Sequence, residues 1–219
     1  MRSKHGDEFN HDNWAEGYDR NVTDETDPIR AGYGQTLDWV AKNAGMIADS
    51  VVLDLGCGTG NLTERLPECS QLVCVDISEK MLTLAKGKIR QAGEVEYVCA
   101  DVLEYFDDCN HQFDAIVSTY AIHYLTASEK AELFALIHAH MRPGGTACFG
   151  DLAFENVSGR RKLEQHFLSI QRRDIVDDFE EEFFWDLEVC SRELRKLGFQ
   201  ILLSRFSDLS WGVRATRNE

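Results

Sequence analysis

Three glycines and two carboxylates in the first half of the chain have the spacing of a cofactor site. Gly56, Gly58 and Gly60 follow the apolar run 51–55, and Asp76 and Asp101 stand at the ends of two later apolar runs. Glycine leaves no Cβ between the backbone and a ligand, and the N–H groups that open a following helix face the same loop. An acid at a strand tip can accept hydrogen bonds from ribose hydroxyls. The pattern predicts a nucleotide-type cofactor at this edge of a sheet.

The glycine spacing decides between cofactors. A dinucleotide fingerprint needs glycine at position 61, where this chain has Asn61. The run D-x-G-x-G-x-G that starts at Asp54 instead resembles motif I of the class I S-adenosylmethionine (AdoMet) methyltransferases. This resemblance implies AdoMet as cofactor, with Gly56, Asp76 and Asp101 as its main contacts. The candidate cofactor-binding residues are Asp54, Gly56, Cys57, Gly58, Gly60, Asp76, Ile77, Met81, Asp101, Val102, Ser118, Trp14 and Tyr18. Ile77 and Met81 flank an adenine ring in this interpretation, or else belong to the core.

Alternating apolar and helical segments must position these residues. Strands are expected at 51–55, 72–76, 95–102, 113–118 and 146–151, with an antiparallel pair at 199–205 and 210–216. Residues 61–66 are expected to open a helix, Ser78 and Asp186 to cap helices, and 126–129 to form a capping box. Residues 143–145 are expected to turn the chain into the fifth strand. The prediction is an α/β, Rossmann-like, seven-stranded mixed sheet with its last strand antiparallel, the class I methyltransferase fold, in one domain over 1–219.

Two segments lie outside this minimal plan. Residues 1–45 are expected to form an N-terminal helical lid, since Trp14 and Tyr18 lie four apart on one helical face; a helix packed on the core is the alternative. Residues 152–185 form a helical insertion, or cap, between strands five and six. Within it, the acids and aromatics of 177–185 form either a solvated rim over a packed edge or a pocket for a cationic substrate.

The loop after the fourth strand holds the candidate catalytic group. His123 is the candidate base, because imidazole accepts a proton near neutral pH; the alternative is a histidine that orients its loop. Tyr120, His123 and Asp151 are the candidate substrate residues. Methyl transfer from a sulfonium needs mainly alignment and desolvation, so a base is optional.

Composition excludes several classes of partner. The net charge of −15 repels phosphate backbones, so no nucleic-acid partner is expected, and the basic clusters 160–162 and 172–173 are taken as solvated faces. No apolar run has the length of a membrane span, and no signal peptide is visible. Seven cysteines without a C-x-x-C pair indicate reduced thiols, no metal site and a cytoplasmic protein. A monomer or homodimer is expected.

More narrowly, the motifs W-A-x-x-Y-D, G-T-G-N-L-T, S-x-Y-A-x-H and D-x-x-F-E-N resemble the YrrT-type methyltransferases. Tyr124 stands where such proteins often have a second histidine, and this substitution puts a paired-histidine role in doubt. The expected function is AdoMet-dependent methyl transfer to a small-molecule acceptor. A non-catalytic protein that binds AdoMet or S-adenosylhomocysteine is the alternative, and a nicotinamide-linked oxidoreductase is disfavoured by Asn61.

Overall fold

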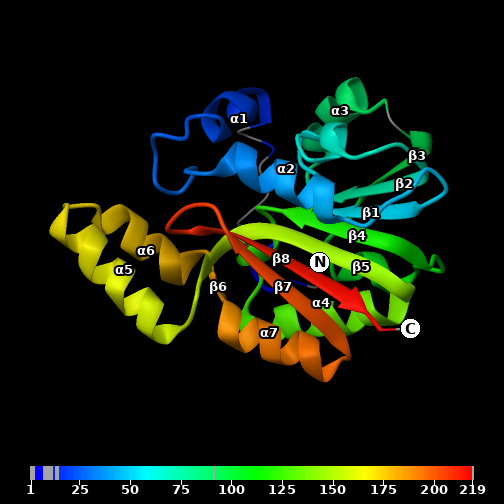
Figure 1. Cartoon of the computed structure of the whole chain (residues 1–219). Helices are drawn as coiled ribbons and strands as arrows, with labels where there is room; N and C mark the ends of the chain where they lie inside the picture. The colour runs from blue at the N-terminus through cyan, green and yellow to red at the C-terminus, as the bar shows by residue number, and fades with distance from the viewer. Residues whose placement is uncertain (1–2, 7–11, 13–14, 91, 219) are drawn as a thin grey trace.

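A computed structural model describes residues 3–6, 12, 15–90 and 92–218. Its centre is a sheet in the order β3-β2-β1-β4-β5-β8-β7, with a two-residue strand β6 paired to β5 outside this path (Figure 1). The strands are β1 Val51–Leu55, β2 Cys69–Asp76, β3 Ala92–Cys99, β4 Phe113–Thr119, β5 Met141–Phe154, β6 Trp185–Asp186, β7 Phe199–Arg205 and β8 Ser210–Arg217.

The pairing within the sheet confirms the predicted mixed topology. β1 to β5 pair in parallel, and β8 inserts antiparallel between β5 and β7. The short strand β6 was not expected. Because the parallel strands share one direction, their carboxyl ends, which carry the glycine loop and both predicted acids, meet at one edge of the sheet.

Helices cover both faces of the sheet and bury two apolar clusters (Figure 1). On one face lie α2 (Tyr33–Asn43) and α3 (Glu79–Lys88), and on the other lie α4 (Ala127–His140) and α7 (Leu187–Lys196). Ser78, Thr126 and Asp186 each accept a backbone N–H at the start of the following helix, and Thr126 with Glu129 forms the predicted capping box. None of the described helices is long and apolar enough to cross a bilayer.

One predicted helix is wrong. Residues 61–66 were expected to open a helix, but the structure has only the single 3-10 turn η2 at Thr63–Arg65. The reason is Pro67, whose ring disfavours the helical conformation of the preceding residue. Leu66 is accordingly extended, at φ −64° and ψ 146°, and the chain runs on into β2. The glycine loop is therefore followed by one turn and not by a full helix.

The fifth strand also begins earlier than predicted, at Met141 in place of residue 146. Met141 pairs with Phe113, and regular pairing resumes at Thr146 with Ala115, so the Pro-Gly-Gly segment is an irregularity within the strand. Gly144 has φ +76°, and a Cβ on Gly145 would lie 2.7 Å from the Met141 side chain. Glycines are needed here because the backbone folds back closely on itself.

Two segments extend the basic fold at the carboxyl edge of the sheet. The N-terminal helix α1 (Ala15–Val22) lies above this edge, and α5 (Val157–Ser169) with α6 (Arg173–Glu181) projects as a pair beyond the end of β5 (Figure 1). Three of the four aromatic residues of 177–185 are buried, and two of these, Phe179 and Phe184, contact the ring of Phe154. Glu180 stays largely exposed and pairs with Arg160, as in a solvated rim over a packed edge.

Candidate functional site

The predicted glycine loop and acids border a single pocket at the carboxyl ends of β1 to β4. Of the predicted residues, those lining it are Gly56, Cys57, Gly58, Asp76, Ile77, Met81, Asp101, Val102, Tyr18 and Tyr120. Further lining residues, which were not among the predicted site residues, are Ser3, Gly6, Tyr33, Thr59, Asn61, Leu62, Thr119, Ala121, Tyr124 and Leu125. Trp14 lies outside the described residues.

The glycine loop is held open by its contacts with β2 and with the loop after β4. The N–H groups of Gly56 and Cys57 both donate to the carbonyl oxygen of Val75, at 2.8 and 3.0 Å. Gly56 has φ +68°, and a Cβ there would lie only 2.3 Å from the Cβ of Ala121. Gly58, at φ +55°, has open space in front of it. The absent side chains leave room for a ligand against bare backbone.

Asp76 ends β2, with one carboxylate oxygen toward the glycine loop and the other toward the start of α3. Oδ2 accepts the N–H of Gly58 at 2.7 Å, and Oδ1 accepts the N–H of Ser78 at 2.8 Å. Burial raises the pKa of Asp76 to about 6, against the opposing effect of these hydrogen bonds. The carboxylate form still predominates at neutral pH, and it has lone pairs left to accept hydrogen bonds from hydroxyl groups of a ligand.

Asp101 follows β3 and lies at the other end of the pocket. Its Oδ1 accepts the N–H groups of Leu103 at 2.8 Å and Glu104 at 3.3 Å. Its Oδ2 accepts the backbone N–H of Ser3 at 3.2 Å and also the Ser3 hydroxyl. The N-terminal segment thus covers the acid on the ligand side, and the amine of a ligand has to share or take over the position of Ser3.

Three predicted cofactor residues lie beneath the pocket and do not line it. Asp54 is buried and accepts the hydroxyl of Thr63 at 2.6 Å; burial raises its pKa to about 7. Ser118 donates to the carbonyl oxygen of Leu55 at 2.6 Å. Gly60 packs against α3, where a Cβ would lie 3.4 Å from Ala85. These residues shape the loop from below.

A polar cluster joins α1 to the glycine loop, and we call Asp19, Thr59, Asn61 and Lys88 the latch. The Lys88 ammonium donates to Asp19 and Asn61, both at 2.6 Å, and to Thr59 at 3.1 Å. Thr59 and Asn61 also donate to Asp19, at 2.6 and 3.0 Å. Partial burial of Asp19 is outweighed by these hydrogen bonds, so its pKa is lowered. In the sequence, Asn61 indicated only that the cofactor is not a dinucleotide.

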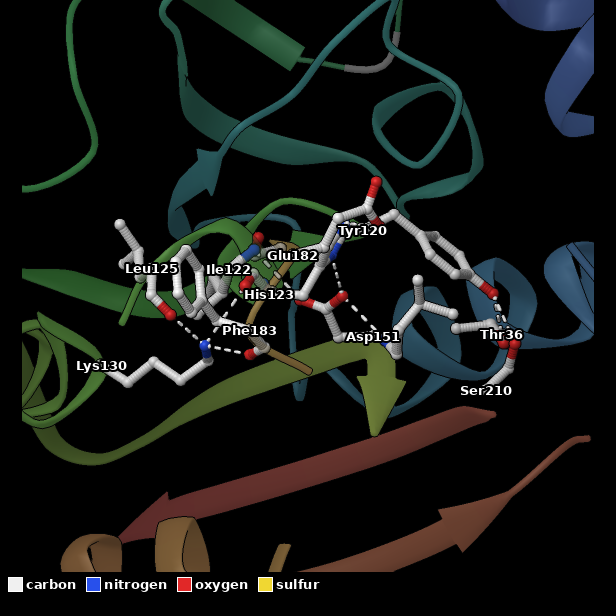
Figure 2. Close-up of polar contacts among 12 residues, drawn as sticks. Thr36, Tyr120, Ile122, His123, Leu125, Lys130, Asp151, Glu182, Phe183 and Ser210 are labelled. Atoms are coloured by element: carbon white, nitrogen blue, oxygen red, sulfur yellow. Dashed lines mark hydrogen bonds and ion pairs between the residues drawn. The ribbon is translucent and has the colours of Figure 1, made fainter. Parts of the chain in front are cut away.

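Four tyrosines, Tyr18, Tyr33, Tyr120 and Tyr124, line the pocket. Tyr33 and Tyr120 have ring centroids 5.1 Å apart. The Tyr120 hydroxyl lies 3.2 Å from the hydroxyls of both Thr36 and Ser210, and its backbone has a positive φ of 51° (Figure 2). Burial raises the pKa of Tyr120 to about 12, so its phenol remains neutral. The result is a neutral aromatic wall.

His123 and Asp151 lie behind this wall. Asp151 accepts the N–H groups of Ile122 and His123 at 3.0 and 3.1 Å, and its Oδ1 lies 2.5 Å from His123 Nδ1 (Figure 2). His123 is only 2% exposed, and its Nε2 faces Glu182 Oε2 at 3.8 Å. Neither His123 nor Asp151 is among the residues that line the pocket, whereas the neighbouring Tyr124 and Leu125 are. This geometry suits the loop-orienting alternative for His123.

The arrangement can hold an adenosine-like ligand. Asp76 can accept hydrogen bonds from two vicinal hydroxyls, and Asp101 can accept one from an amine. Ile77 and Met81 offer apolar contact to a ring. Across the described residues no group of three or more His, Cys, Asp or Glu side chains has the geometry of a metal site.

The methyltransferase domain family matches residues 52–145. An uncharacterized methyltransferase of Geobacillus kaustophilus is 34% identical over 93% of this chain and 94% of the relative, and one of Anoxybacillus flavithermus is 32% identical over 94% and 95%.

Solved structures show the same fold at low identity. Magnesium protoporphyrin IX methyltransferase (ChlM) from Synechocystis PCC 6803 with bound SAH superposes with a TM-score of 0.69 at 20% identity, over 97% of this chain and 98% of that one. N-methyltransferase NodS from Bradyrhizobium japonicum WM9 superposes with a TM-score of 0.65 at 15% identity, over 86% of this chain and 97% of that one. With a class I, Rossmann-like sheet and relatives that match over nearly its whole length, the chain belongs to the methyltransferase family.

Proposed function

We propose that this protein transfers a methyl group from AdoMet to a small-molecule acceptor. The observation that carries the proposal is the convergence of the Gly56–Gly58 loop, Asp76 and Asp101 on one pocket. Fold neighbours that were solved with bound SAH and SAM support the same cofactor. Bound AdoMet supplies a methyl group on a sulfonium, which is already activated for in-line displacement.

The residues of the chain have separate parts in holding this cofactor. Asp76 accepts the ribose hydroxyls, Asp101 accepts the adenine amine beside the N–H of Val102, and Ile77 with Met81 contacts the ring. The glycine loop lets the rest of the cofactor approach the backbone. Asp54, Gly60 and Ser118 act indirectly, because they fix the loop from beneath.

The remaining wall orients the acceptor and excludes water. The four tyrosines supply aromatic faces close to the loop after β4, and α1 closes over them through the latch. Desolvation of this kind favours displacement at a sulfonium, since it removes competing water from the reacting groups. We assign His123 and Asp151 to holding the loop that carries Tyr124 and Leu125. A small acceptor is consistent with a pocket closed by the chain's own lid.

The test is a screen for S-adenosylhomocysteine formed from AdoMet by the pure protein with fractionated metabolite pools. The proposal predicts product with at least one fraction, and loss of product in Asp76→Ala. Binding of AdoMet without product in any fraction would instead favour the alternative, a protein that binds the cofactor without chemistry. Product formed at an unchanged rate by Asp76→Ala contradicts the assigned site.

A further inference from the structure

The first turn of α4 contains a buried lysine whose ammonium donates hydrogen bonds to backbone carbonyl groups. Lys130 is 3% exposed. Its ammonium donates to the carbonyl oxygens of His123 at 3.4 Å, of Leu125, and of Phe183 at 2.7 Å (Figure 2). A buried ammonium is costly unless it is well compensated, so a lysine whose hydrogen bonds within the described residues all go to carbonyl groups calls for a reason.

The three carbonyl groups belong to two segments that are far apart in sequence. His123 and Leu125 lie in the loop after β4, whose residues Tyr124 and Leu125 line the pocket. Phe183 follows α6, at the end of the insertion. One ammonium therefore joins the pocket wall to the cap. From the opposite side Asp151 holds the N–H groups of the same loop, so the loop lies between an anion at its N–H groups and a cation at its carbonyl groups.

The backbone at Phe183 provides a second, independent observation. Phe183 has φ +49°, a conformation that a bulky residue adopts only when its surroundings hold it there. The hydrogen bond from Lys130 to its carbonyl oxygen is such a restraint. The preceding residue, Glu182, is thereby placed with Oε2 3.8 Å from His123 Nε2. The strained residue thus sets where the cap meets His123.

We propose that Lys130 is a positioning residue that fixes the loop 122–125 and the end of the cap to each other, and so shapes the acceptor side of the pocket. Only the statement that this wall faces the methyl acceptor rests on the proposed function. The clamp itself, which we define as the contacts of Lys130 with His123, Leu125 and Phe183, is independent of any ligand.

The charge of the clamp depends on pH. Burial lowers the pKa of Lys130 to about 8, although Cys190 on α7, Asp151 on β5 and Glu129 on its own helix oppose this shift. Burial raises the pKa of the Cys190 thiol to about 12, so this thiol does not titrate in the same range. A neutral amine has one donor fewer than an ammonium and loses charge assistance. The clamp is therefore expected to loosen as the pH rises through about 8.

Hydrogen exchange read by mass spectrometry on the ligand-free full chain tests the clamp. In Lys130→Met we expect amides of 120–125 and 182–184 to exchange about tenfold faster or more, because charge-assisted hydrogen bonds are lost. Peptides of β1 and β2 should be unchanged, and Lys162→Met, at an exposed position on α5, should match the wild type. Exchange in both segments that equals the wild type, or that rises equally throughout the protein, overturns the proposal.

The pH profile of the wild type provides a test that needs no variant. With the intrinsic chemical rate divided out, protection of 120–125 and 182–184 should fall between pH 7 and 9, and Lys130→Met should lack this step. A flat wild-type profile, or an equal step in Lys130→Met, overturns the proposal. Because no ligand is present, failure of the clamp is distinct from failure of the proposed function, which the product screen measures.

Discussion

At the scale of single residues, the pocket depends on side chains that are absent as much as on those present. Gly56 faces Ala121 so closely that even a methyl group collides, and its positive φ adds strain for any other residue. Asp76 and Asp54 are both buried with raised pKa values, yet they differ in place: Asp76 borders the pocket, and Asp54 lies beneath it. Each has a consequence that can be measured.

Gly56→Ala is expected to weaken S-adenosylhomocysteine binding about tenfold or more and to cost about 1–3 kcal/mol of stability. The new Cβ would lie 2.3 Å from Ala121, so the loop has to move into the pocket. Gly87→Ala, exposed on α3 with nothing near the new Cβ, is the matched control and should stabilise the protein by roughly 0.5–1 kcal/mol. Calorimetry and thermal unfolding measure both. Equal binding by the two variants contradicts the assignment.

Asp54 should make the protein less stable as the pH rises. Its pKa is about 7 in the folded state against 3.8 as the reference value, so between these values the folded protein holds a proton that the unfolded chain has released. Raising the pH across this range therefore costs stability, by up to roughly 1.4 kcal/mol per unit. Asp54→Asn removes the dependence. In denaturant unfolding from pH 5 to 8, the free energy of unfolding of the variant should rise relative to that of the wild type. Equal pH dependence of the two free energies would refute this.

At the scale of elements, α1 is attached to the glycine loop by the latch and not by a large apolar face. Within α1 only Ala15 and Val22 are fully buried, and Tyr18 is partly buried against the core. Asp19 meets Thr59, Asn61 and Lys88, which come from the loop and from α3. An element held by a few polar contacts at a pocket mouth opens more readily than one held by a core, which is the property a lid requires.

Lys88→Met should release α1. Because the Lys88–Asp19 pair is partly exposed, we expect a loss on the order of 1 kcal/mol, or about fivefold in S-adenosylhomocysteine affinity. Hydrogen exchange of 15–22 should rise in parallel. Lys86→Met, on the same helix but against Tyr97, is the control and should change neither. Faster exchange without any change in affinity would show that α1 packs on the core without acting as a lid.

The elements also show what sequence reasoning can and cannot reach. Asp76 and the glycines were predictable because strand, turn and following residues are adjacent in the chain. The single turn at Thr63–Arg65 is equally local, because Pro67 disfavours a helical conformation at Leu66. Ser3 against Asp101 and Lys130 against Phe183 are separated by 98 and 53 residues. Such contacts are set by how helices and caps pack, and no local pattern encodes them.

At the scale of the whole molecule, the mixed sheet brings five parallel strand ends to one edge, and the two extensions of the chain close this edge from different sides. α1 reaches it through the latch, and the cap reaches it through Lys130 and Phe183. β8 inserts antiparallel between β5 and β7 and completes the sheet. Under the proposed function, binding is therefore expected at the edge of the sheet and access is expected to depend on the two extensions.

Calorimetric titration with S-adenosylhomocysteine, on the wild type and on Asp76→Ala, tests the central claim most directly. The wild type should bind, with affinity that declines below pH about 6 as Asp76 is protonated. Asp76→Ala should bind roughly tenfold to a hundredfold more weakly, because hydrogen bonds to a charged group are lost, and should lack this pH step. No heat with the wild type, or equal affinity in the variant, would contradict the account.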